Sequence, residues 1–122
     1  MTKKSIRVGA GSGFSDDRME PALELAEHGD IDYLVFECLA ERTIARETLT
    51  RLKNPLAGYT PYLADRMRLV LPECMRRGIR IVTNMGAANP LQAARVVREE
   101  AQALGLAAPS VASVTGDDVT EV

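Results

Sequence analysis

The sequence is poor in several residue types, and each shortage excludes a class of protein. It has no Trp, aromatic residues make up 4% of the chain, and two Cys and one His are spread over 122 residues. Two Cys cannot form the disulfide framework of a small secreted scaffold. Because His28 is the one His and falls in the last turn of a predicted helix, we expect neither a Ser–His–Asp triad nor a zinc site.

Excess charge of one sign and long apolar runs are missing as well. The 15 Lys and Arg residues nearly balance the 17 Asp and Glu residues, which leaves a net charge of −2 and no basic surface for nucleic acid. No apolar run approaches the ~20 residues that cross a bilayer. The charged start of the chain is not followed by the apolar region of a signal peptide. We therefore expect a cytoplasmic protein with neither nucleic-acid nor membrane partners.

The remaining composition is that of an ordinary globular domain, with 46% hydrophobic and 26% charged residues. Segments rich in apolar and β-branched residues alternate with segments that have helical periodicity. Such alternation predicts βαβ units and a mostly parallel sheet. The predicted strands are residues 6–10, 33–36, 79–83 and 110–115, and the predicted helices are residues 17–28, 42–52, 60–78 and 90–104.

These elements predict one Rossmann-like, three-layer α/β domain over residues 1–122. The long connection between the second and third strands favours the strand order 2-1-3-4, and the order 3-2-1-4 stays open. No helix follows the fourth strand to cover it. We therefore expect a homo-oligomer, a partner chain over the sheet, or the N-terminal portion of a larger protein.

Two prolines mark predicted helix features. Asn89 precedes Pro90, which is the pattern of an N-cap followed by proline at the first helical position. Pro72 lies inside the helix predicted over residues 60–78 and removes one of its hydrogen bonds. We expect a kink there or two short helices.

Polar residues concentrate just after the predicted strands, where open α/β sheets bind ligands. Glu37 continues a buried apolar strand, so its carboxylate is either paired with an arginine or placed in a site as an acid–base group. Asn84 follows the third strand, where an amide orients a carbonyl or an oxyanion. We predict that Glu37 and Asn84 are catalytic and that Asp17 assists them.

The same loops supply residues for substrate binding. The glycine-rich first loop leads into a helix, which suits either an anion cradle or a tight turn with Asp17 as helix cap. The dinucleotide fingerprint is incomplete because Phe14 replaces its third glycine. The capping role is an alternative for Asn89. The predicted substrate-binding residues are Gly11, Ser12, Gly13, Arg18, Glu41, Arg42, Gly86 and Asn89.

Asp117 and Asp118 follow the fourth predicted strand. With Asp16, Asp17 and Glu37 they would form an oxygen-rich corner if the loops converge. Oxygen ligands suit a divalent cation such as Mg²⁺ or Mn²⁺. The alternative is that both aspartates are simply solvated.

Together these blocks resemble the acyclic terpene utilisation (AtuA-like) family. The resemblance rests on the glycine-rich block 8–18, the block 32–43 around Glu37, the block 84–90 after the third strand, and Gly116-Asp117-Asp118. It implies a chain several hundred residues long that takes part in bacterial breakdown of branched isoprenoid acids through CoA thioesters. It assigns no catalytic residue.

The functional hypothesis is a catabolic enzyme that acts on an acidic or acyl-CoA-type small molecule, with a lyase or hydratase-like step. Two alternatives remain. The chain is either a non-catalytic structural or binding subunit of a larger assembly, or a nucleotide-binding module.

Overall fold

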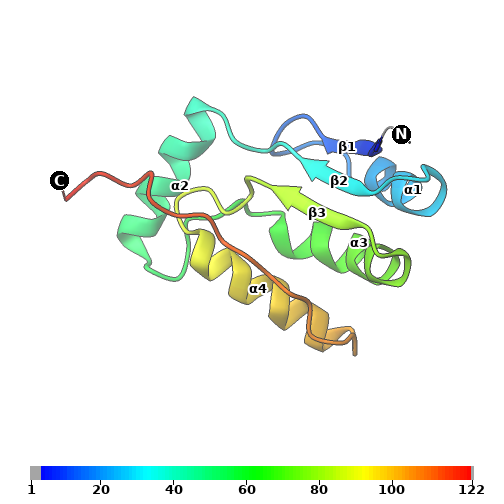
Figure 1. Cartoon of the computed structure of the whole chain (residues 1–122). Helices are drawn as coiled ribbons and strands as arrows, with labels where there is room; N and C mark the ends of the chain where they lie inside the picture. Colours follow the sequence, from blue (N-terminus) through cyan, green and yellow to red (C-terminus); the bar gives the residue numbers. More distant parts are fainter. Residues whose placement is uncertain (1–3, 122) are drawn as a thin grey trace.

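The structure, a computed structural model, describes residues 4–121 (Figure 1). Among these residues no helix is long and apolar enough to cross a membrane. Strands and helices alternate along the chain as the sequence predicts. The strands are β1 (Val8–Ser12), β2 (Tyr33–Phe36) and β3 (Arg80–Thr83), and the helices are α1 (Glu20–His28), α2 (Glu41–Lys53), α3 (Leu63–Arg77) and α4 (Pro90–Ala103).

The sheet has three parallel strands in the order β1-β2-β3. The predicted order 2-1-3-4 is wrong, because β2 lies between β1 and β3. The order 3-2-1-4 has the right neighbours for these three strands. The long connection from β2 to β3 does not pass over another strand. Of its two helices, α2 stands away from the sheet (Figure 1) and α3 packs against β3.

The prediction of a fourth strand is wrong for the described residues. Residues 108–115, which we call the strap, run extended but form no ladder with β3. Their hydrogen bonds are with α4: the Ser113 hydroxyl donates to the Pro90 carbonyl at 3.2 Å, and the Arg98 guanidinium donates to the Val111 carbonyl at 3.1 Å. The strap is thus fastened to the helix and not to the edge of the sheet.

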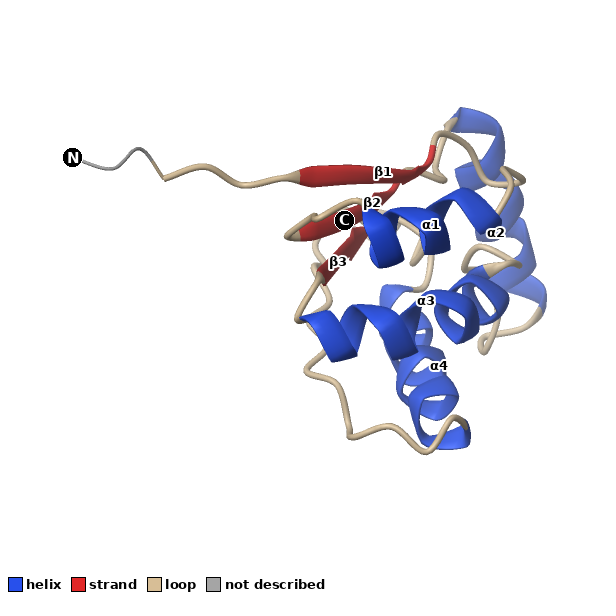
Figure 2. Cartoon of the chain, turned by 90° about the vertical axis from the view of Figure 1, so that its right-hand side faces the viewer, coloured by secondary structure: helices blue, strands red, loops and turns tan. Residues whose placement is uncertain are grey.

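The layers also differ from the prediction. Helices α1, α3 and α4 lie on one side of the sheet, so the described chain has two layers instead of three (Figure 2). Leu34 and Phe36 of β2 face these helices and are fully buried. On the other face, Val8 and Val82 are 56% and 53% exposed. One face of the sheet therefore holds the core, and the other exposes Val8 and Val82 beside the Tyr33–Arg80 pair.

The observed helix ends and Pro72 test three predictions made from local sequence patterns. The Asn89 side chain caps α4 by accepting a hydrogen bond from the Gln92 N–H at 3.4 Å. Helix α3 runs through Pro72 as one element, so the prediction of two short helices is wrong. Loss of one hydrogen bond is tolerated there because Leu71 and Cys74 bury the same turn in the core. Helix α1 begins at Glu20 and not at Asp17.

Candidate functional site

The loops that follow β2 and β3 meet through Glu37 and Asn84. The Asn84 Nδ2 donates to Glu37 Oε1 at 2.9 Å, and its Oδ1 accepts from the Cys38 N–H at 2.7 Å. The Leu39 N–H donates to the same Glu37 oxygen at 2.9 Å. Parallel strands end at a common edge, and that geometry brings the carboxylate and the amide together as predicted.

The pKa of Glu37 is lowered, first by the hydrogen bond from Asn84 and then by that from the Leu39 N–H. The side chain is exposed, and within the described chain it forms no ion pair. Glu37 is therefore ionised at neutral pH and is stabilised by an amide instead of an arginine. In this state it accepts protons and does not donate them.

Asp17 organises the loop after β1. Its carboxylate accepts hydrogen bonds from the Gly13 N–H at 2.9 Å and the Arg18 N–H at 2.8 Å. These two bonds, in that order, lower the pKa of Asp17. The carboxylate folds the loop onto itself, so the alternative in which Asp17 caps α1 is wrong. Asp17 is also unavailable as a free base while both bonds persist.

A buried arginine that the sequence analysis missed lies beneath all three loops. Arg66 of α3 is 1% exposed. Its Nη2 donates to the Asp17 carbonyl at 2.9 Å, and its Nη1 lies 3.7 Å from Cys38 Sγ and 4.0 Å from Met85 Sδ. These three contacts belong to the loops after β1, β2 and β3 respectively. Arg66 therefore joins the loops from below.

The guanidinium of Arg66 lies 5.9 Å from the centre of the Tyr62 ring but forms no ion pair within the described chain. No carboxylate of residues 4–121 lies within salt-bridge distance, and its Nε has no hydrogen-bond partner there. Burying an unpaired charge is costly, so the surroundings of Arg66 favour a negative charge nearby. A signal was present in the sequence, because Arg66 interrupts the apolar stripe formed by Leu63, Met67 and Val70.

Cys38 is buried against Arg66 and remains a thiol. Burial raises its pKa, against the opposing effects of the Ser12 hydroxyl, whose Oγ is 3.2 Å from Cys38 Sγ, and of Arg66. Nucleophilic chemistry needs a thiolate. Cys38 is therefore part of the wall of the site and not its nucleophile.

The predicted substrate-binding residues of the first loop support the site more than they line it. Gly11 lies in β1, and a Cβ there would come within 2.7 Å of the Phe36 ring. The Ser12 hydroxyl donates to the Glu37 carbonyl at 3.1 Å, and the Gly13 N–H is held by Asp17. These residues fasten β1 to the loop after β2.

A small hollow of about 130 Å³ lies between the first and second loops. Arg42 lines it without an ion pair among the described residues, as do Glu37 and Cys38 of the second loop. Arg18 and Glu41 are exposed outside it. The hollow is lined by Gly13, Phe14, Ser15, Asp16, Glu37, Cys38, Leu39, Ala40, Arg42 and Thr43.

The third loop has structural tasks. The Asn89 amide donates to the Pro55 and Ala57 carbonyls, each at 2.9 Å, in addition to its capping role. A Cβ on Gly86 would come within 2.9 Å of the Pro90 backbone. Both residues fix the loop that presents Asn84.

Comparison of the sequence with known protein families identifies the family of this chain. A family model described as "Acyclic terpene utilisation family protein AtuA" matches residues 6–122, a range that includes all the loops described above. The chain belongs to the AtuA family. No curated protein and no solved structure matches it. The resemblance inferred from the sequence blocks is thereby confirmed.

The acidic corner predicted from the sequence is not formed in this AtuA-family chain. Among residues 4–121, no three His, Cys, Asp or Glu side chains lie close enough to hold a metal ion. Asp118 instead contacts Arg51 at 3.4 Å and is bound by Thr120, and these hydrogen bonds from Thr120 lower its pKa. Asp117 is exposed at the end of the strap. The loops converge on Arg66, a cation, and not on a group of carboxylates.

Proposed function

We propose that this AtuA-family chain contributes the site of a catabolic enzyme that binds an acidic or acyl-CoA-type small molecule. The observation that carries the proposal is the Glu37–Asn84 pair, held by three loops above the unpaired charge of Arg66. A buried cation beneath a polar rim favours a ligand with a negative or strongly polarised oxygen. The exposed Arg42 adds a second cation at the mouth of the hollow.

The chemistry that fits this pair is removal of a proton, as in a lyase or hydratase-like step. Glu37 is ionised, so it takes the proton from the carbon beside the carbonyl and, once protonated, returns it to the departing hydroxyl, which leaves as water. A substrate carbonyl that accepts the Asn84 N–H would take away the hydrogen bond that contributes most to the low pKa of Glu37. The carboxylate would then become a stronger base at the moment the substrate is in place.

The test is conversion of a panel of acyl-CoA thioesters and their free acids, followed by mass spectrometry. Glu37→Gln should reduce turnover at least about a hundredfold, the lower range for loss of an acid–base group, while the circular dichroism spectrum stays unchanged. Glu99→Gln is the matched control, because Glu99 is an exposed glutamate on α4. Turnover by Glu37→Gln at the parental rate, or conversion of none of the panel by the parent chain, would contradict the proposal.

A second function is favoured by the uncovered face of the sheet. Parallel sheets are normally covered on both faces, and Val8 and Val82 expose more than half of their area here. The chain would then be a binding subunit completed by a second copy or another protein. The nucleotide-binding alternative has less support, because Asp17 already occupies the Gly13 N–H that would cradle a phosphate.

A further inference from the structure

We infer that a groove beneath the outer edge of β3 binds an aliphatic chain that carries a carbonyl group at one end. The groove has a volume of about 990 Å³ and lies between β3, α4 and the strap. Volumes of 300–1,000 Å³ are typical of sites for small molecules. Only the orientation of the ligand in this groove rests on the proposed function.

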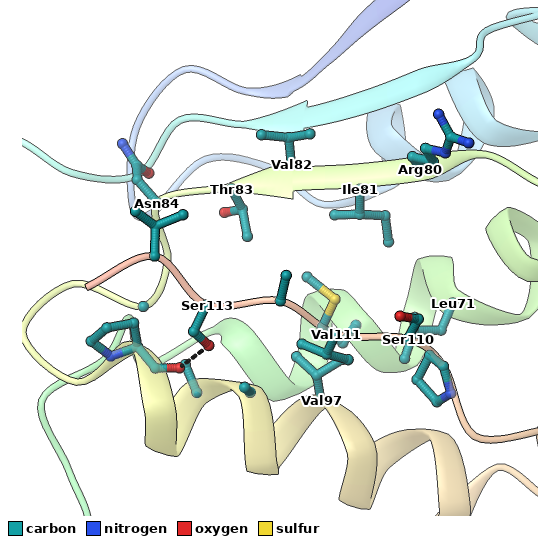
Figure 3. A pocket seen from close by; sticks show the side chains of 18 of the residues that line it. Leu71, Arg80, Ile81, Val82, Thr83, Asn84, Val97, Ser110, Val111 and Ser113 are labelled. Carbon is teal, nitrogen blue, oxygen red and sulfur yellow. Dashed lines mark hydrogen bonds between the residues drawn. The ribbon is translucent and has the colours of Figure 1, made fainter.

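The walls of the groove are mostly apolar, with Arg80, Ser110 and Ser113 as polar exceptions along its length. Ile81 points down from β3, and Val97 of α4 and Val111 of the strap lie opposite it, while Val82 points away on the other face (Figure 3). Ile81, Val97 and Val111 remain only half-buried although all three face this space. Their unburied area is the driving force for an apolar ligand.

The lining of the groove runs along two elongated elements, β3 and α4, which suits an extended chain. It follows β3, whose four residues span ~13 Å, and continues along α4. Small side chains make the room, with Ala93 and Ala94 on the helix side and Ala112 on the strap side. Met67 and Met75 add flexible thioethers that adapt to an irregular hydrocarbon.

Polar groups line the end of the groove next to the carboxyl end of β3, and they determine where the polar end of the ligand lies. Thr83, Asn84 and Asp117 line that mouth, which adjoins the Glu37–Asn84 pair. The exposed carboxylate of Asp117 disfavours a free carboxylate at this end, so a neutral carbonyl such as an ester or thioester fits better. Under the proposed function, the carbonyl end of the ligand lies at this mouth.

The experiment compares methyl decanoate with methyl butanoate by methyl NMR titration of the chain. Each added CH₂ strengthens apolar binding by up to about fourfold, so methyl decanoate should bind at least about tenfold more tightly. The Ile81, Val97 and Val111 methyl resonances should shift on binding. Equal affinity of the two esters, or shifts confined to other methyls, would overturn the inference.

Two variants obstruct the groove from different elements. Ala94→Phe fills it from α4 and has Ala103→Phe, at an exposed position of the same helix, as its control. Val111→Asp places a charge on the strap and has Val119→Asp, beyond the groove, as its control. Both groove variants should weaken methyl decanoate at least about tenfold, and both controls should bind like the parent. Parental affinity in Val111→Asp, which alters a segment without a ladder, would exclude the groove even if Ala94→Phe failed to fold.

Two further readouts separate this inference from its alternatives. Amide hydrogen exchange on the ligand-free chain should leave residues 110–115 unprotected. Protection of these amides together with β3 would mean that the strap closes the space itself, and the inference would fail. Glu37→Gln should bind methyl decanoate like the parent, since Glu37 does not line the groove. If Glu37→Gln loses turnover but still binds methyl decanoate, both proposals are supported. If it loses turnover as proposed but no longer binds the ester, only the groove inference fails.

Discussion

Single residues at this site are fixed by their neighbours more than by their own type. The sequence predicted that Glu37 and Asn84 lie on one rim of the sheet because both follow strands, and in the structure a 2.9 Å hydrogen bond joins them. It did not reveal Arg66, because a helix residue far along the chain is matched to these loops only by the tertiary fold. The position of Asp17 before a predicted helix suggested a helix cap, but its carboxylate instead accepts hydrogen bonds from the nearby Gly13 and Arg18 N–H groups.

Gly11 illustrates a residue whose type is set by packing. In Gly11→Ala, the new Cβ would lie 2.7 Å from the Phe36 ring, a contact that forces the ring or β1 to move. We expect the free energy of unfolding to fall by about 1–3 kcal/mol, the usual cost of overpacking. Urea denaturation measures this change.

Gly13→Ala is the matched control for that measurement. Its Cβ would have the Asp17 carboxylate at 3.9 Å as its nearest neighbour, and Gly13 has an ordinary negative-φ backbone. We expect a change within about 0.5 kcal/mol. Equal losses of unfolding free energy in both variants would show that position 11 requires glycine for its backbone freedom and not because of the Phe36 contact.

Whole elements were predictable where local chemistry specifies them. Helix α4 starts at Pro90 because Asn89 caps it, and the apolar run of β2 has the bounds expected from the sequence. Strand order was not predictable, because the length of a connection does not show whether its helices cross the sheet or project from it. The strap has the composition of a strand, but a ladder also requires a partner edge at hydrogen-bonding distance, and no pattern within the segment can specify that.

The end of helix α3 makes a prediction about pH. Hydrogen bonds from Arg76 and then Arg77 lower the pKa of Glu73 to about 2. Because the folded pKa lies below the unfolded one, this ion pair stabilises the fold fully above pH ~4.5. Its contribution is lost as the pH falls from there towards 2.

Thermal unfolding between pH 6 and pH 2 measures that contribution. Glu73→Gln should flatten the decline in melting temperature over this interval, whereas Glu99→Gln should keep the parental slope, because Glu99 forms no ion pair in the described chain. High salt should reduce the difference, since these side chains are partly exposed. Identical slopes for all three proteins would refute the assignment.

At the scale of the molecule, the one-sided arrangement of helices decides what the chain must contact. The α/β class was predictable from alternating elements, but the three-layer architecture was not, because the helices of successive connections all lie on the same face (Figure 2). Val8 and Val82 are left exposed on the uncovered sheet surface as a consequence. Such a surface tends to associate.

We expect the chain to associate through this face. Sedimentation velocity should show a concentration-dependent increase in mass, and Val82→Lys should shift the chain to the monomer, because a lysine cannot be buried against an apolar face without cost. Val119→Lys, at a position 67% exposed outside the sheet, should sediment like the parent. A parent chain that stays monomeric at high concentration would show that the face has no affinity for a second copy.

The irregular pairing at the end of β1 has a consequence for the site. Ala10 pairs with Val35 and Ser12 with Phe36, so one extra residue enters the strand between them. That extra residue turns the Ser12 hydroxyl inward, where it reaches the Glu37 carbonyl and Cys38. The junction between the first two loops thus depends on a count of residues as well as on their identity, because unbroken alternation after Ala10 would place the Ser12 side chain on the other face of the sheet.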